Sequence, residues 1–206
     1  MGIKERIIVK AGDLFFQYGI KSVSMDELAS SLGISKRTIY KNFKDKEEIL
    51  LSLLVRLRDE RKKIFTSLIS DNNNVVEIFV KVIEIQQSTP ICNVKFFEDI
   101  YKYYPEANNY LQDDVNKNKT FLSNFLKKGI EQGYIREDLN VDAAAFLVEQ
   151  STHIYIRATS LDKPPFTFSE LFYTMMINFV RGISTEKGIK IIDAYLEQQK
   201  AKNRIL

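Results

Sequence analysis

The stretch that decides the fold is "SMDELASSLGISKRTIYKNF", residues 24–43. It opens with a capping box, in which Ser24 accepts a hydrogen bond from the backbone N–H of Glu27 and the Glu27 carboxylate reaches back. Gly33 then permits a tight turn, and Ser35 caps a second short helix. Helices this short are not stable alone in water, so tertiary packing must hold them. The order of helix, glycine turn and helix predicts a helix-turn-helix.

Helical periodicity continues on both sides of this stretch, and no strand alternation or hairpin turn interrupts it convincingly. We therefore expect an all-α protein with an N-terminal three-helix helix-turn-helix domain, residues 1–48. A larger helical domain should follow over residues 49–206. Besides the capped helix that ends at Gly33, we expect helices at about 3–18, 36–42, 46–70, 75–88, 92–104, 106–132, 141–160, 168–184 and 185–202.

Apolar residues at helical spacing predict which faces of the N-terminal helices are buried. The core of the first domain should contain Leu14, Phe15, Leu28, Leu32, Ile39, Phe43 and Ile49. The long fourth helix carries an apolar stripe of Ile49, Leu50, Leu53, Leu54, Leu57, Ile64, Phe65 and Leu68.

Positive charge is concentrated in the second half of the quoted stretch. Residues 35–46 contain five basic residues and one acidic residue, while the net charge of the whole chain is only +3. With Ile39 and Phe43 turned inward, Arg37, Tyr40 and Lys41 point outward together. A solvated basic surface helix is the alternative for such a run. The preceding capped helix and the Gly33 turn favour DNA binding.

The composition argues against several other classes of function. One Cys and one His are too few for a usual zinc site, and a single Cys fits a reducing compartment. No apolar run is long enough to span a membrane, so we expect a soluble cytoplasmic protein without metal or cofactor. No paired-carboxylate or phosphate-loop motif indicates an enzyme; a Cys92–His153 pair is the one reactive combination left open.

The segment "FFQYGIKSVSMDELASSLGISKRTIYKNFKDKEEIL" resembles the N-terminal DNA-binding domain of the TetR/AcrR family of bacterial transcriptional regulators. The match covers about residues 5–55. The resemblance implies a dimeric, all-helical protein that releases DNA when a small ligand binds the larger domain. It makes residues 1–48 the expected DNA-binding domain and residues 49–206 the expected effector-binding and dimerisation domain. Here Arg37 stands where the family often has a small residue, and Lys41 where it often has His, which leaves the operator sequence open.

The resemblance also implies which residues touch DNA, with the third helix as the recognition helix. The expected contacts from that helix are Lys36, Arg37, Thr38, Tyr40 and Lys41. The expected phosphate contacts are Ser24, Ser35 and Lys46. Lysine is unfavourable for the helix dipole in a first turn, and a phosphate contact would explain Lys46 there.

Aromatic residues in the larger domain form a candidate pocket for a small apolar effector, although an ordinary aromatic core is the alternative. The candidate lining residues are Phe96, Phe97, Tyr101, Tyr104, Phe121, Phe125 and Tyr155. Two helices, at about 141–160 and 168–184, are apolar over wide arcs, and they match in order the family's dimer-forming helices. The candidate interface residues are Leu147, Ser151, Ile154, Phe172, Met176 and Phe179.

The sequence thus favours a ligand-responsive DNA-binding regulator, with repression as the family expectation. A homodimer would supply the two-fold symmetry of a palindromic operator. The first alternative is an effector-independent dimeric DNA-binding protein, and the second is a helical enzyme.

Overall fold

The computed structural model describes residues 1–70, 72–88, 94–150, 166 and 168–203. These residues form two compact units. The first contains Met1–Lys63 and the described part of 91–116, and the second contains the described parts of 64–90, 117–158 and 162–206. Apart from an isolated antiparallel bridge between Ile135 and Ser184, the regular structure of the described residues is helical, as expected.

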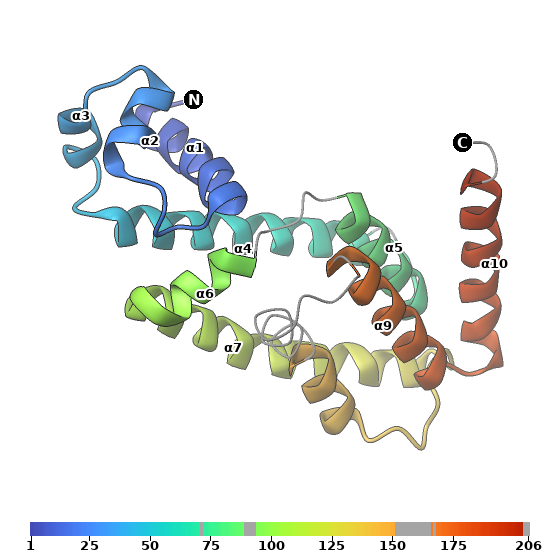
Figure 1. Cartoon of the computed structure of the whole chain (residues 1–206). Coiled ribbons are helices and arrows are strands. Elements are labelled where there is room, and N and C mark those ends of the chain that lie inside the picture. The colour runs from blue at the N-terminus through green and yellow to red at the C-terminus, as the bar shows by residue number, and fades with distance from the viewer. Residues whose placement is uncertain (71, 89–93, 151–165, 167, 204–206) are drawn as a thin grey trace. The chain divides into compact units, whose positions relative to one another are not determined.

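The first unit gathers three N-terminal helices beside the start of a long fourth helix (Figure 1). Its helices are α1 (Ile3–Tyr18), α2 (Met25–Leu32), α3 (Lys36–Tyr40), the first part of α4 (Lys46–Ser70), α6 (Val94–Tyr103) and the start of α7 (Pro105–Glu131). The predicted core is confirmed as one cluster, with Phe15, Leu28, Ile39, Phe43 and Ile49 buried and Leu14 and Leu32 partly buried. The helix-turn-helix therefore rests on both α1 and α4.

Some predicted helix ends in this unit differ from the structure by one or two residues. We expected the third helix to reach residue 42, but α3 ends at Tyr40, and Asn42 lies in a turn where its side-chain amide donates to the Thr38 carbonyl. We expected the seventh helix to start at residue 106, but it starts at Pro105. Proline is favoured at the first helical position, because the N–H that it lacks would have no partner within the helix.

The second unit is built around α5 and α9, which pack against each other and against α10. Its helices are α5 (Val75–Ser88), the later part of α7, a helical stretch at 141–150, α9 (Phe168–Ile183) and α10 (Glu186–Asn203). Val76, Leu126, Val180 and Ile192 are buried in its core. Ile64, which we placed on the buried stripe of α4, is 42% exposed instead.

Candidate nucleic-acid interface

Both helices of the helix-turn-helix begin at the predicted N-caps, Ser24 for α2 and Ser35 for α3. Ser24 Oγ accepts from the Glu27 N–H at 3.1 Å, and Glu27 Oε2 accepts from the Ser24 N–H at 2.7 Å. These hydrogen bonds from Ser24 keep the pKa of the Glu27 carboxyl below its ordinary value. Gly33 adopts the left-handed conformation, with φ of 64°, and its N–H returns to α2. Ser35 then caps α3 by accepting from the Thr38 N–H at 3.1 Å.

Helix α3 has one buried side and one open side. Ile39 is fully buried, and Phe43 just beyond the helix is buried as well. On the open side Arg37 and Lys41 are exposed, and Tyr40 is 48% exposed although it is a large aromatic residue. The buried side fixes the helix, so the open side can enter a groove of DNA without rearranging the core.

Lys36, the first residue of α3, is paired within the domain. Its Nζ lies 2.8 Å from Asp26 Oδ2 in the first turn of α2. This hydrogen bond raises the pKa of Lys36. The predicted contact of Lys36 with DNA therefore competes with an existing contact.

Lys46 is also engaged internally. Its Nζ donates to the Ile20 carbonyl at 3.0 Å, and burial lowers the pKa of the ammonium group. This contact accounts for a lysine in the first turn of α4, where the helix dipole disfavours it. The predicted phosphate contact of Lys46 stays a prediction, and it requires the ammonium to leave Ile20.

Asp45 caps α4 by accepting from the Glu48 N–H at 2.9 Å. The Glu48 carboxylate accepts from the Lys44 N–H, so Asp45 and Glu48 form only half of a capping box. The chain between α3 and α4 is therefore anchored by side chains at both ends, which sets the recognition helix against α4.

Comparison with known proteins agrees with this geometry. The model of the family described as bacterial regulatory proteins, tetR family, matches residues 7–53, which include α1, α2, α3 and the start of α4. The chain belongs to the TetR family of transcriptional regulators. The regulator therefore binds DNA through the helix-turn-helix described above. Because this family is non-enzymatic, the enzyme alternative is set aside.

Relatives extend the similarity along the chain. The HTH-type transcriptional repressor KstR2 of Mycobacterium tuberculosis is 22% identical over 152 residues, covering 71% of this chain and 76% of that protein. A transcriptional regulator from Saccharomonospora viridis, solved in complex with choline, has a TM-score of 0.74 at 20% identity, covering 89% of this chain and 98% of that one. These identities support a shared fold along most of the chain.

The aromatic residues proposed for a pocket fall into both compact units. Phe96 is buried in the first unit, where its ring lies 4.9 Å from that of Phe16 in an edge-to-face contact. Phe97 and Tyr104 pack partly buried against the same cluster, and burial raises the pKa of Tyr104 to about 12. Tyr101 is exposed.

In the second unit, Phe125 is buried and contacts three other rings. The ring centroids of Phe65 and Phe79 both lie 5.3 Å from that of Phe125, and Phe121 stacks at 6.3 Å. Phe121 is 46% exposed, so this aromatic cluster reaches the surface at one end. Tyr155 lies outside the described residues, as do Cys92 and His153.

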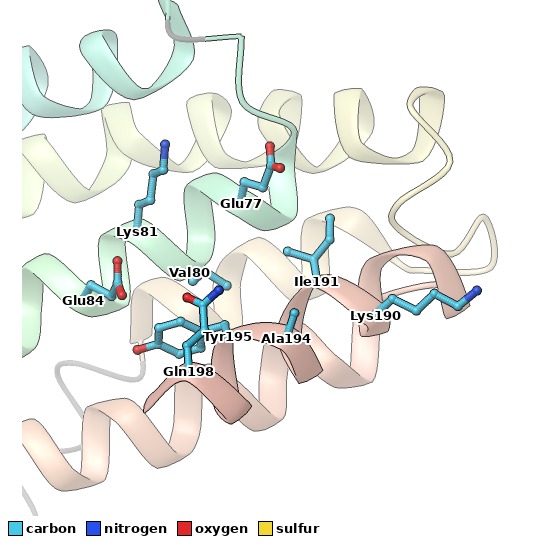
Figure 2. A pocket seen from close by; sticks show the side chains of 9 residues that line it. All are labelled: Glu77, Val80, Lys81, Glu84, Lys190, Ile191, Ala194, Tyr195 and Gln198. Carbon is cyan, nitrogen blue, oxygen red and sulfur yellow. The ribbon is translucent and has the colours of Figure 1, made fainter. Parts of the chain in front are cut away.

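A depression of about 400 Å³ lies elsewhere in the second unit, between α5 and α10 (Figure 2). None of the predicted pocket residues that the structure describes lines it. Its floor includes Val80, Ile191 and Tyr195, and Glu77 and Glu84 stand on the α5 side. Sequence reasoning missed it, because α5 and α10 are far apart in the chain and nothing in either helix indicates that they pair.

The candidate dimer-interface residues differ in exposure. Leu147 is 59% exposed, and Phe146 beside it is exposed too. Phe172 and Phe179 are partly buried against the core of the second unit, while Met176 is buried within it. Ser151 and Ile154 lie outside the described residues.

No helix of the described residues is long and apolar enough to cross a membrane. Within the same residues, no group of three or more His, Cys, Asp or Glu side chains is placed to hold a metal ion.

Proposed function

We propose that this TetR-family regulator is a ligand-responsive repressor, which a small apolar effector releases from its operator. The observation that carries the proposal is the open face of α3, where Arg37, Tyr40 and Lys41 project from a helix anchored by its buried side. Exposed basic and aromatic side chains on a fixed helix suit the major groove, where an arginine can bind guanine in bidentate fashion.

Contacts with DNA divide into two classes under this proposal. Base edges are read from the open face of α3, and phosphates position the domain. The residues proposed for α3 contacts are Lys36, Arg37, Thr38, Tyr40 and Lys41, and those proposed for phosphates are Ser24 and Ser35. Lys36 would have to exchange its internal partner Asp26 for DNA.

The regulator acts in this proposal as a cytoplasmic homodimer on a palindromic operator. Residues 1–48 bind DNA, and residues 49–206 bind the effector and dimerise. The exposed pair Phe146 and Leu147 on the helical stretch at 141–150 supports a partner surface there, because adjacent large apolar side chains rarely stay in water without a reason. Two-fold symmetry would then match two half-sites.

Regulation by a small molecule has two supports. The Saccharomonospora viridis relative holds choline, and the KstR2 relative is described as a repressor. In this chain the aromatic cluster of Phe65, Phe79 and Phe125, open at Phe121, favours an apolar ligand in the second unit. Of the residues predicted for the pocket, this proposal keeps Phe121 and Phe125, which both belong to the second unit.

A displacement screen tests this function. The protein is bound to a labelled genomic fragment that it has itself selected, and apolar small molecules are added one at a time. The expected result is that a compound releases the DNA and also raises the melting temperature of the free protein, as mass action requires of a bound ligand. A matched variant, Phe125→Leu, should need more of the same compound.

The alternative is an effector-independent DNA-binding dimer. It predicts that compounds raising the melting temperature leave the DNA affinity unchanged. Such a result across all bound compounds would reject ligand-controlled repression while keeping sequence-specific DNA binding.

A further inference from the structure

The peptide group between Ile20 and Lys21, in the turn that joins α1 to α2, is hydrogen bonded on both sides by charged side chains from other helices. Lys46 Nζ of α4 donates to its carbonyl oxygen at 3.0 Å. Asp99 Oδ2 of α6 accepts from its N–H at 2.7 Å. We propose that Lys46 and Asp99 are positioning residues for DNA binding, which act together through this peptide to fix the α1–α2 turn between α4 and α6.

The charges suit the peptide that they hold. A carbonyl oxygen carries partial negative charge and faces the ammonium of Lys46, while the N–H carries partial positive charge and faces the carboxylate of Asp99. Hydrogen bonds to ionised groups are shorter and stronger than neutral ones. The charge of Asp99 also favours the charged form of Lys46, against the larger effect of burial. Removing either group therefore weakens the hydrogen bond made by the other.

Further contacts show that α6 lies against this turn along one side. Lys95, Asp99 and Tyr103 are spaced four residues apart, which places them on one face of the helix. Lys21 Nζ donates to the Tyr103 hydroxyl at 3.0 Å. A Cβ at Gly19 would lie 3.1 Å from both Asp99 Oδ2 and Lys95 Cβ, and Gly19 has φ of 85°. Glycine thus permits both the close approach and the backbone conformation of the turn.

This arrangement gives the turn a role in recognition. Lys46 is the first residue of α4, and α3 ends only a few residues earlier. The peptide in the turn that precedes α2 is therefore hydrogen bonded to the first residue of the helix that follows α3. If these hydrogen bonds are lost, the recognition helix can adopt more orientations. Affinity for the specific DNA site then falls more than affinity for unrelated DNA, which depends mainly on attraction to phosphates.

The test uses full-length protein, a genomic fragment selected by the wild type, and an unrelated duplex, titrated at several salt concentrations. The variants are Lys46→Met, Asp99→Asn and the double variant, with Asp13→Asn, an exposed acid on α1, as the charge control. Removing a negative charge should by itself strengthen binding to DNA. We nevertheless expect Asp99→Asn to weaken binding to the selected fragment about tenfold, while Asp13→Asn does not weaken it.

The lysine variant separates positioning from phosphate contact. Loss of a phosphate contact lowers the salt slope of log K by about 0.9. We expect Lys46→Met to weaken binding to the selected fragment with its salt slope unchanged. The double variant should lose no more affinity for the selected fragment than the single variant with the larger loss, because both residues act through one peptide. A lower salt slope for Lys46→Met, with additive losses in the double variant, would overturn the proposal.

Amide hydrogen exchange supplies a readout that needs no DNA. The Lys21 amide should exchange faster in Asp99→Asn, and also in Lys46→Met, although Lys46 bonds only to the carbonyl of that peptide. Lys46→Arg keeps a donor and should restore slow exchange, which controls for a general loss of structure. Unchanged exchange in Lys46→Met would contradict the coupling, whatever the outcome of any effector screen.

Discussion

At the residue scale, the pair of Asp26 and Lys36 limits how much positive charge α3 offers to DNA. The exposed ion pair adds little stability, because solvent and salt screen the attraction between surface charges. Its larger consequence is electrostatic, because an ammonium held 2.8 Å from a carboxylate is less available to a phosphate. In the proposed mode of binding, the exposed Arg37 on this helix and Lys41 just after it then carry more of the contact with bases.

Substitution Asp26→Asn should therefore make DNA binding tighter and less selective. With Lys36 released, we expect affinity for an unrelated duplex to rise and the salt slope to steepen by about 0.9, the value for one phosphate contact. Fluorescence anisotropy at several salt concentrations measures both quantities. Adding Lys36→Ala to Asp26→Asn should reverse the steeper slope. Equal behaviour of Asp26→Asn and the control Asp13→Asn would contradict this role of the pair.

At the element scale, short capping signals made the N-terminal helices predictable. Ser24, Glu27, Gly33 and Ser35 act within a few residues of their own position, so α2 and the turn could be read from the sequence alone. The bond between Lys46 and Ile20 could not be read this way, because it joins residues from different helices. Sequence reasoning therefore noticed that Lys46 is unusual in a first turn, but assigned the cause to DNA.

Longer elements were harder to assign in detail. Apolar residues at a fixed spacing move gradually to another face of a long straight helix, because the spacing does not match 3.6 residues per turn. Helix α4 is 25 residues long. Ile64 consequently turns toward solvent although it fits the early pattern. The aromatic residues show the same difficulty, since periodicity marks Phe96 and Phe125 as buried without saying that they belong to different compact units.

The α2 capping box predicts a dependence of stability on pH. The folded pKa of Glu27 lies below its ordinary value of 4.5, so its contribution is present above the unfolded pKa and is lost as pH falls through the folded pKa. Thermal melts of wild type and Glu27→Ala should differ at pH 7 and converge toward pH 3. By contrast, Ser24→Ala should cost about 1 kcal/mol at pH 7 by loss of the cap. A constant difference between wild type and Glu27→Ala across this range would contradict the carboxylate's role.

At the scale of the whole molecule, the two compact units correspond to the two tasks that we propose for the regulator. The first holds the recognition helix on a firm base of α1, α4 and α6. The second contains the aromatic cluster and the exposed Phe146 and Leu147 that support the proposed effector site and dimer. The family and the helical fold followed from the sequence, whereas the depression between α5 and α10 emerged only from the arrangement of helices distant in the chain.

The most direct measurement is binding of the purified protein to DNA from just upstream of its own gene, beside an unrelated duplex, at several salt concentrations. The wild type should bind the upstream DNA far more tightly than the unrelated duplex, and should weaken steeply with salt as counterions are released. The double variant Arg37→Ala, Tyr40→Ala should lose this preference while keeping the melting temperature of the wild type, since both side chains are exposed. If the double variant retained wild-type affinity and preference for the upstream DNA, recognition through the open face of α3 would be contradicted.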